Sequence, residues 1–315
     1  MSKKITLVFP GQGSQYVGMG NNLKDSPAYE YFNRADKVLN FSLSELCNAG
    51  PAEELKLTKF TQPAIVTHSI ALFSNLKKIL AEKEITIERV LGHSVGEYSA
   101  LVAAGSLSFE DAVKAVHLRG QYMQKAVPAG KGSMYAILKC PQEKILEACE
   151  QASTEDEKVQ PANFNEPNQI VISGHKEACE RAVTWLGENI TGRLRALELP
   201  VSAPFHSTLM LPAEEKMAET LNSLEFKPNG VEYIANIDAQ TYAEGTEAQI
   251  IKDNLIKQIC GSVLWTQSMQ SIPEGSIIIE VGPGKVLSGL AKKINRDFKI
   301  LSLDNDDAWE EVKNL

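Results

Sequence analysis

Short apolar runs alternate along the chain with longer segments whose apolar residues recur at helical spacing. The run 5–9 predicts a buried strand, and a second short strand is predicted to end at 91. A helix is predicted over 62–80, with Thr61 as its cap and Pro63 in its first turn. This alternation indicates an α/β body.

Two more helices are predicted after the second strand. One covers 96–104, is rich in small residues and has Gly105 as its stop. The next begins at Ser108, where Asp111 completes a capping box, and is predicted to end near Val127. The remaining predictions for the body are helices over 213–224 and 248–259 and a buried strand over 276–281.

The middle of the chain has a different order of predicted elements. They are a strand over 134–138, a helix over 142–152, strands over 160–163 and 169–173, a helix over 176–186 and a strand over 194–199. This βαββαβ order is typical of a ferredoxin-like unit. We therefore predict that residues 131–200 form a small subdomain, inserted into a larger body made of residues 1–130 and 201–315.

Length and composition are those of a globular protein with a substantial core. The chain has 315 residues, 43% of them hydrophobic and 23% charged. Its formal net charge of -8 argues against a generic nucleic-acid binder, and no apolar run predicts a membrane helix. The run 5–9 is also too short for a signal peptide. The five cysteines form no CxxC pair, so we expect a reduced, cytoplasmic protein with neither a zinc site nor a disulfide framework.

Ser94 is the candidate nucleophile. The segment Gly92-His93-Ser94-Val95-Gly96 fits the pattern GxSxG, in which a sharp turn lifts the serine side chain out of the fold. Short glycine motifs also occur by chance. The predicted strand before this segment and the predicted helix after it favour the functional interpretation.

A serine nucleophile needs a base, and the chain has five histidines. His206 is the best candidate, because it lies in the irregular stretch 202–207 and catalytic groups favour such loops. The others have simpler interpretations: His68 as a hydrogen-bonded core residue, His117 on a polar helix face, His175 in a turn after a strand, and His93 as a neighbour of the serine that points elsewhere.

Two polar side chains interrupt apolar helix faces. Arg119 shares a face with Val116 and Met123, and Gln258 shares one with Leu255. A snorkelling or internally paired arginine and a structural glutamine would give the same pattern. The functional alternative is a buried guanidinium that awaits an anionic ligand, since guanidinium binds carboxylate in a planar, bidentate geometry. The two intrusions together indicate a lined pocket.

Two glycine-containing turns give weaker signals. The loop 9–15 fails to complete GxGxxG, because Tyr16 occupies the position of the last glycine, but it offers backbone N–H groups to an oxyanion. The turn 282–285 lacks the spacing of a phosphate-binding loop, so that interpretation is rejected.

Taken together, these motifs resemble the malonyl-CoA:acyl carrier protein transacylase family. The matching segments are FPGQGSQ at 9–15, TQPA at 61–64, GHSVGEYSAL at 92–101, RG at 119–120, NFNEPNQIVISG at 163–174, APFHS at 203–207, Q at 258 with VLW at 263–265, and EVGPGKVLSGL at 280–290. They span about residues 5 to 295. Lys139 stands where a glycine is common, and Gly261-Ser262 replaces a frequent Asn-Pro; neither departure touches a proposed catalytic group.

The resemblance implies both a fold and a reaction. The fold is an α/β-hydrolase-like body with a parallel sheet and an inserted ferredoxin-like subdomain. The reaction is transfer of malonyl from malonyl-CoA to the phosphopantetheine thiol of acyl carrier protein, in fatty-acid or polyketide synthesis. It runs as ping-pong catalysis through an ester on Ser94, with no metal or redox cofactor. A monomer is expected.

The resemblance also assigns roles to individual residues. Ser94 is the nucleophile and His206 its base, in a dyad without an acidic third member. Arg119 binds the malonyl carboxylate, and Gln258 organises the pocket and the histidine. The backbone N–H groups of Gln12 and Val95 form the oxyanion hole.

Further residues are expected around this centre. Asn163, Asn165 and Gln169 are expected at the entrance used by coenzyme A. Phe205 is expected to crowd a branch at the malonyl α-carbon. Arg193 and Arg195 are candidates for docking an acidic carrier protein, with ordinary solvated strand residues as the alternative.

Two other functions stay open at this point. The first is a serine acyl hydrolase or esterase, against which Arg119 argues, because an uncharged acyl group has no use for a buried cation. The second is a non-catalytic module that binds acyl carrier protein or acyl-CoA. The presence of both Ser94 and His206 argues against it.

Overall fold

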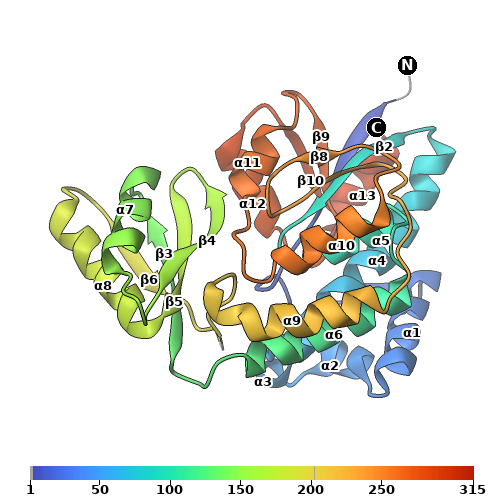
Figure 1. The fold of residues 1–315 in the computed structure, drawn as a ribbon. Coiled ribbons are helices and arrows are strands. Elements are labelled where there is room, and N and C mark those ends of the chain that lie inside the picture. The colour runs from blue at the N-terminus through green and yellow to red at the C-terminus, as the bar shows by residue number, and fades with distance from the viewer. Residues whose placement is uncertain (1–2, 202) are drawn as a thin grey trace.

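The structure is a computed structural model that describes residues 3–201 and 203–315. These residues form two sheets with their helices, which lie side by side in Figure 1. The first and last parts of the chain build the larger unit, and the middle of the chain builds the smaller one. Within the described residues, none of the helices combines the length and the apolar character needed to cross a bilayer.

The larger sheet is built around β1 (Lys4–Phe9), whose residues 5–9 are all buried. A nearly continuous apolar run is what a parallel strand covered on both faces requires. The strand pairs in parallel with β2 (Thr86–Gly92) and β9 (Ile277–Glu280). The full order is β10-β9-β1-β2-β7-β8, with β10 at Lys299–Ser302, β7 at Glu232–Ile234 and β8 at Thr241–Tyr242. β8 is antiparallel to β7, and the other pairings are parallel.

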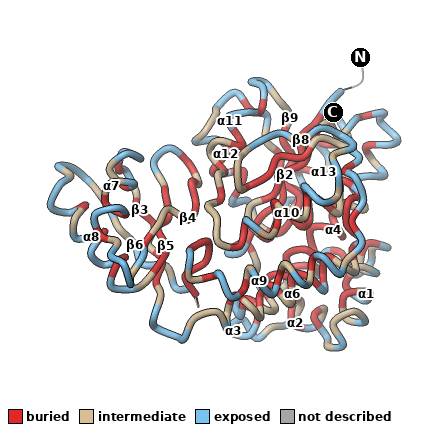
Figure 2. Tube along the Cα trace, viewed as in Figure 1, coloured by how far each residue is buried: buried red, intermediate tan, exposed pale blue. Residues whose placement is uncertain are grey.

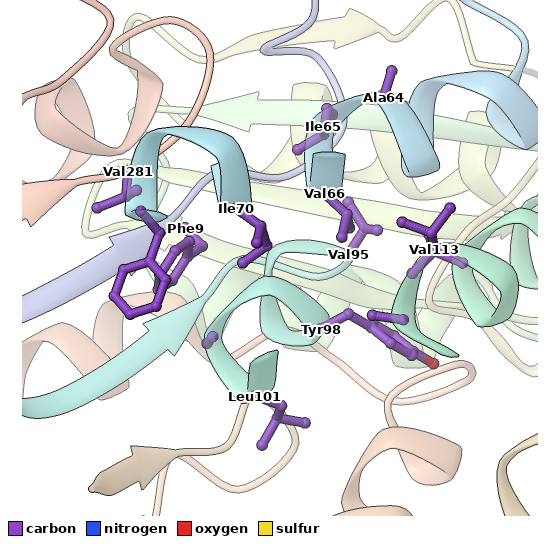
Figure 3. Close-up of a cluster of buried hydrophobic side chains, with 14 of the residues drawn as sticks. Phe9, Ala64, Ile65, Val66, Ile70, Val95, Tyr98, Leu101, Val113 and Val281 are labelled. Carbon is purple, nitrogen blue, oxygen red and sulfur yellow. The ribbon is translucent and has the colours of Figure 1, made fainter. Parts of the chain in front are cut away.

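Alternate residues of β1 belong to different hydrophobic cores. Phe9 packs in the core that contains α4 (Thr58–Glu82) and α5 (Gly96–Ala103), which Figure 3 shows in close-up. Val8 packs on the opposite face, in a core that contains residues of α11 (Trp265–Gln270) and α12 (Val286–Ile294). Helices therefore cover both faces of the sheet, as the α/β prediction requires.

The remaining elements of the larger unit complete this cover. They are α1 (Glu30–Leu39), α2 (Leu43–Ala49), α3 (Ala52–Leu55), α6 (Phe109–Lys125), α9 (Leu211–Asn222), α10 (Ala248–Lys257) and α13 (Asp306–Lys313), with 3-10 turns η1 (Asn21–Leu23), η2 (Pro27–Tyr29) and η3 (Thr208–Met210). Buried residues concentrate along the strands of the sheet and along α4 (Figure 2).

The smaller unit consists of β3 (Gly132–Leu138), α7 (Gln142–Ala152), β4 (Val159–Glu166), β5 (Gln169–His175), α8 (Lys176–Asn189) and β6 (Arg195–Glu198). Its sheet has the order β4-β5-β3-β6, and all neighbouring strands are antiparallel. The predicted βαββαβ order is therefore confirmed. The exact division at residues 131 and 200 stays a prediction.

The N-terminus of α4 was predicted wrongly. The helix begins at Thr58 with Leu57 as its cap, so Thr61 is not the cap and Pro63 lies inside the helix. A proline inside a helix leaves the carbonyl four residues earlier without its usual donor. That carbonyl belongs to Lys59, and it lies 2.7 Å from Nδ1 of His117 on α6, which donates to it. A contact from another helix thus permits a continuation that local signals argue against.

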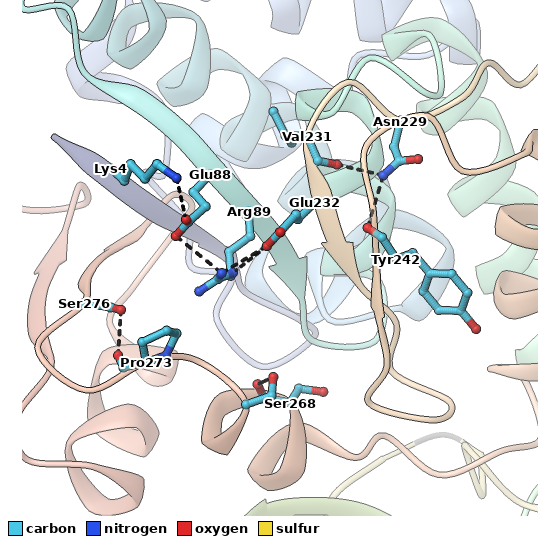
Figure 4. Close-up of polar contacts among 11 residues, drawn as sticks. Lys4, Glu88, Arg89, Asn229, Val231, Glu232, Tyr242, Ser268, Pro273 and Ser276 are labelled. Atoms are coloured by element: carbon cyan, nitrogen blue, oxygen red, sulfur yellow. Dashed lines mark hydrogen bonds and ion pairs between the residues drawn. The ribbon is translucent and has the colours of Figure 1, made fainter. Parts of the chain in front are cut away.

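Glycine and charge set the spacing of the surrounding elements. A Cβ atom on Gly120 would lie 2.6 Å from the backbone oxygen of Thr58, so α6 and α4 can approach closely only at a glycine. Between two neighbouring strands of the sheet, Arg89 of β2 forms an ion pair of 3.0 Å with Glu232 of β7 (Figure 4). Such contacts hold the strands that carry the site in register.

Several other expectations differ from the structure at element ends. The helix predicted to reach Val127 ends at Lys125, and the helix predicted to reach 259 ends at Lys257. The second difference places Gln258 at the C-cap position, where its backbone oxygen is free of the helix. The elements that the pattern did not predict are η1–η3, α1–α3, β7, β8, α11, α12, β10 and α13.

Candidate active site

Ser94 lies on the sharp turn between β2 and α5, with φ at 50°. A residue other than glycine in this left-handed region stores strain of about 1 to 3 kcal/mol. A Cβ on Gly92 would lie 2.0 Å from the carbonyl carbon of Gly96, and one on Gly96 would lie 2.1 Å from the backbone oxygen of Phe9. The turn therefore requires glycine on both sides of the serine, as the GxSxG pattern indicates.

Asn236 holds this strained turn from the segment that follows β7. Its Oδ1 accepts a hydrogen bond of 2.7 Å from the backbone N–H of Ser94. Its Nδ2 donates a bond of 2.7 Å to the backbone oxygen of Gly92. One buried amide thus satisfies backbone groups on both sides of the turn. Asn236 was not predicted as a site residue, because a single asparagine after a three-residue strand carries no motif.

His206 faces Ser94, with Nε2 2.8 Å from the serine Oγ. On the other side of the ring, Nδ1 lies 2.8 Å from the backbone oxygen of Gln258 and 3.1 Å from that of Gly261. Since both oxygens can only accept, Nδ1 carries the proton and the lone pair of Nε2 faces the serine hydroxyl. Burial, followed by the charge of Arg119, lowers the pKa of His206 to about 3, against the effect of the backbone bonds. The neutral ring can therefore accept the serine proton.

Arg119 on α6 is 1% exposed and lies beside the same serine. Its Nη2 donates to Oε1 of Gln258 at 2.9 Å and to Oγ of Ser94 at 3.2 Å. Its buried Nε has no partner among the described residues, and none of their carboxylates forms an ion pair with it. Burial lowers the pKa of Arg119, while its electrostatic interactions with Tyr98 and Glu97 act in the opposite direction. The guanidinium is thus a buried cation with donors left to offer.

Gln258 connects the three residues just described. Its side chain accepts from Arg119, donates to the backbone oxygen of Ser94 at 3.0 Å and donates to the carboxylate of Glu97. Its backbone oxygen accepts from His206. Of the two predicted polar intrusions, Arg119 lines the cavity, whereas Gln258 lies behind it at the C-cap of α10 and contacts Arg119, Ser94 and His206.

A cavity of about 180 Å³ opens onto these groups. Its lining residues are Gln12, Gln62, His93, Ser94, Val95, Arg119, Met123, Met134, Asn163, Asn165, Val171, Leu199, Val201, Phe205 and His206. They come from both units of the fold. Within residues 3–201 and 203–315, the backbone N–H groups of Gln12 and Val95 have no hydrogen-bond partner. An oxyanion in the cavity could therefore accept from them.

Comparison with known proteins identifies the family. The model of the acyl transferase domain family matches residues 6–298. The malonyl CoA-acyl carrier protein transacylase of Bacillus subtilis (strain 168) is 45% identical over 311 residues, which cover 98% of this chain and 95% of that protein. The chain belongs to the malonyl CoA-acyl carrier protein transacylase family.

Solved structures of related transacylases have the same fold. The acyl-carrier-protein S-malonyltransferase of Burkholderia pseudomallei 1710b is 40% identical with a TM-score of 0.92, and the match covers 99% of this chain and 100% of that one. A malonyl-transacylase solved in complex with its type II PKS acyl-carrier protein is 37% identical with a TM-score of 0.89, and the match covers 99% of both chains. The predicted α/β-hydrolase-like body with a ferredoxin-like subdomain is confirmed.

The other histidines of this transacylase do not compete with His206. His93 lines the cavity, but its Nε2 lies 2.8 Å from Oδ1 of Asn165. His175 ends β5 in the smaller unit. His68 is fully buried, as expected, but the predicted hydrogen bond is wrong, because neither ring nitrogen has a hydrogen-bond partner among the described residues, and Nε2 lies 4.0 Å from Oδ1 of Asp304. Burial lowers the pKa of His68 to about 3, so the ring is neutral and the missing bonds leave no charge unpaired.

The entrance residues divide into two groups. Asn163 and Asn165 line the cavity of the transacylase, whereas Gln169 begins β5 and does not line it. Their role at the entrance used by coenzyme A stays a prediction. Gln169 is on the same face of β5 as Val171, which lines the cavity, but it lies two residues further toward the turn of the β4–β5 hairpin. Gln62 was not singled out. It is 2% exposed, lines the cavity and has an Oε1 atom without a partner among the described residues.

Metal ligation has no candidate site in the part of the transacylase that the structure describes. Those residues contain no group of three or more His, Cys, Asp or Glu side chains placed to hold an ion. The cavity instead offers a hydroxyl, an imidazole, a guanidinium and two backbone N–H groups. This set suits the transfer of an acyl group that carries a negative charge.

The neutral state of His206 in the transacylase has a measurable consequence for stability. Its folded pKa of about 3 lies below the value of about 6.5 in an unfolded chain, so the unfolded state binds the additional proton between these values. His206 therefore makes the protein lose stability as the pH falls below about 6.5. From pH 7 to pH 5, the free energy of unfolding should drop by about 2 kcal/mol more in the wild type than in His206→Leu. Urea unfolding at both pH values measures this, and an equal drop in the two proteins would contradict a neutral His206.

Proposed function

We propose that this protein transfers malonyl from malonyl-CoA to the phosphopantetheine thiol of acyl carrier protein through an ester on Ser94, in fatty-acid or polyketide synthesis. The observation that carries the proposal is the buried Arg119, whose Nη2 lies 3.2 Å from the serine hydroxyl. A cation so close to Oγ of Ser94 can pair with the carboxylate of a malonyl group whose carbonyl carbon is bound to that oxygen. An uncharged acyl group would leave it unpaired.

The first half-reaction forms the ester. As Oγ of Ser94 attacks the thioester carbonyl, Nε2 of His206 takes its proton across the 2.8 Å contact. The backbone N–H groups of Gln12 and Val95 hold the developing oxyanion, a contribution of about 3 to 4 kcal/mol per donor where one has been removed elsewhere. The carbon–sulfur bond then breaks. The departing thiolate takes the proton from His206 and leaves as coenzyme A.

The second half-reaction repeats these steps with a different thiol. His206 takes the proton from the phosphopantetheine thiol, whose sulfur attacks the malonyl ester. The carbon–oxygen bond to Ser94 breaks, and the proton on His206 returns to the serine. The exchange of ester and thioester involves no net oxidation and so needs no redox cofactor. We propose that no metal takes part either, because the backbone N–H groups of Gln12 and Val95 hold the oxyanion.

The electrostatics of Arg119 support malonyl as the acyl group. A buried charge without a partner is costly, and an ionised carboxylate is the partner that a guanidinium binds in bidentate geometry. The Nε atom of Arg119 has no other partner among the described residues. Phe205, which lines the cavity next to His206, leaves little room for a branch at the α-carbon.

Carrier protein would dock on the face of the small sheet that leads to the cavity. Leu197 is paired with Ala136, and Arg195 with Leu138, so all four side chains are on one face. Ala136 packs in the core of the larger unit, which places this face toward the cavity. Arg195 is exposed there, and Leu197 is 51% exposed. A basic and an apolar side chain suit an acidic carrier protein.

A cytoplasmic location is also part of the proposal. All five cysteines are free thiols in the structure, and four of them are buried. Cytoplasmic proteins keep thiols in this reduced form. Malonyl-CoA would be the acyl donor that the protein uses in the cytoplasm.

Replacement of the serine tests the covalent intermediate. Ser94→Ala should form no malonyl adduct and should lose transfer by on the order of a million-fold, as when a catalytic nucleophile is removed elsewhere. Intact-mass spectrometry after brief exposure to malonyl-CoA measures the adduct. Ser99→Ala is the matched control, because Ser99 is buried on the same helix, and it should keep the adduct. Normal transfer by Ser94→Ala would overturn the proposed mechanism.

Replacement of the arginine tests the acyl group. Arg119→Ala should lower acylation by malonyl-CoA roughly 30- to several-thousand-fold, the range for truncating one partner of a buried charge pair, and should spare acylation by acetyl-CoA. The measurement is the ratio of the two acylation rates. Arg89→Ala is the control, since Arg89 is buried but paired with Glu232 away from the cavity. An equal fall for both substrates would remove the physical basis for malonyl.

Charge reversal tests the docking face. Arg193→Glu combined with Arg195→Glu should raise the Michaelis constant for carrier protein about tenfold and leave acylation by malonyl-CoA unchanged, because rim charges act mainly on association. Lys77→Glu with Lys78→Glu makes the same change in net charge near the far end of α4. This control should affect neither half-reaction. Equal effects of the two pairs would show that overall charge, not this face, attracts the carrier protein.

A further inference from the structure

Glu97 is a fully buried carboxylate for which the mechanism above has no use. It lies in the first turn of α5, three residues after Ser94. One carboxylate oxygen accepts from the hydroxyl of Tyr233 and, at 3.3 Å, from the backbone N–H of Asn236. The other oxygen accepts from Nε2 of Gln258. No basic side chain of the described residues forms an ion pair with it.

The contact with Gln258 determines which way that amide points. In the observed orientation, Nε2 donates to Glu97 and to the backbone oxygen of Ser94, and Oε1 accepts from Arg119. A rotation of 180° would keep the shape of the side chain. It would place the amide oxygen against two acceptors and the NH₂ group against the donors of Arg119. An acceptor at Glu97 therefore favours the one orientation in which Gln258 can hold the guanidinium.

We propose that Glu97 is a positioning residue, which fixes the amide of Gln258 so that Gln258 holds Arg119 in place for the malonyl carboxylate. The inference rests on the proposed function. Gln258 also keeps the two charged groups apart. A carboxylate in direct contact with Arg119 would occupy the donors that the substrate needs, whereas a neutral amide between them leaves Nε free.

The role depends on an acceptor rather than on the negative charge. Burial raises the pKa of Glu97 to about 7, against the effect of its hydrogen bonds and of Arg119, so both protonation states are accessible near neutral pH. In the protonated state, the proton can lie on the oxygen that faces Tyr233, whose hydroxyl can turn to accept it. The oxygen that faces Gln258 still accepts in both states.

Three variants test this role through the acylation of the enzyme by malonyl-CoA and by acetyl-CoA. Glu97→Leu removes the acceptor and should raise the Michaelis constant for malonyl-CoA about tenfold, with little change in acylation by acetyl-CoA. Glu97→Gln should stay within about threefold of the wild type, because the new amide can turn its oxygen to Gln258 and its NH₂ group to Tyr233, and loses only the long bond of 3.3 Å from the backbone N–H of Asn236. Glu97→Gln combined with Tyr233→Phe also removes the Tyr233 hydroxyl, which would accept from the new NH₂ group. This double variant should lose its preference for malonyl-CoA over acetyl-CoA.

Coupling to Gln258 separates positioning from general damage. In a Gln258→Leu background there is no amide to orient, so Glu97→Leu should cause no further change in the malonyl-to-acetyl ratio. Glu280→Leu is the matched control for the loss of a buried carboxylate, since Glu280 accepts from the backbone of α12 and not from Gln258. It should lower thermal stability without changing the ratio.

The outcomes are distinguishable. A wild type that does not prefer malonyl-CoA over acetyl-CoA would contradict the proposed function itself. With that preference present, an unchanged ratio in Glu97→Leu, or a loss that persists in the Gln258→Leu background, would overturn the positioning role. Equal damage from Glu97→Gln and Glu97→Leu would also overturn it, because charge would then be what matters. If Glu97→Leu fails to fold, the comparison of Glu97→Gln with its Tyr233→Phe combination decides alone.

Discussion

Arg119 brings a positive charge to a position where no carboxylate of the described residues touches it. Removing a charge from water costs several kcal/mol unless hydrogen bonds and an opposite charge offset that cost. Without substrate, this cost is only partly offset for Arg119. Its contacts are the amide of Gln258, the hydroxyl of Ser94 and the ring of Tyr98, whose centroid lies 5.9 Å from the guanidinium carbon. The substrate carboxylate would complete the offset. Selectivity in such a site comes from the missing opposite charge, because the protein leaves the guanidinium without a carboxylate partner in the absence of substrate.

The site residues must be held rigidly if Arg119 is to stay without an opposite charge. Ser94 stays in a left-handed conformation because Asn236 bonds to the backbone on both sides of it and because Gly96 lets the turn touch β1. Gln258 holds the imidazole with its backbone and the guanidinium with its side chain. The groups of the site come from the β2–α5 turn, α6, the segment before α9 and the end of α10, so packing of the whole larger unit sets their distances. This is the arrangement expected of a preorganised site.

Much of the site could be predicted because its chemistry leaves local marks. GxSxG is required by close backbone contacts around Ser94, and an arginine on an apolar face is visible from spacing alone. Asn236 and Glu97 left no such mark. Asn236 follows a strand of three residues, and Glu97 lies in the first turn of a helix, where an acidic residue is ordinary. Their importance arises from partners between 136 and 161 positions away in the sequence. These are the turn at 92–94 and Glu97 for Asn236, and Tyr233, Asn236 and Gln258 for Glu97.

The sequence by itself determined the alternation of strands and helices, the βαββαβ order of the smaller unit and the residue types of the site, because these follow from periodicity and turn chemistry within a short segment. Tertiary structure decided where α4 begins, since His117 on another helix bonds to the Lys59 carbonyl that Pro63 leaves free. It also decided that two backbone oxygens, of Gln258 and Gly261, orient His206. Every residue has a backbone oxygen, so no pattern of side chains can show which of them the fold brings to the imidazole.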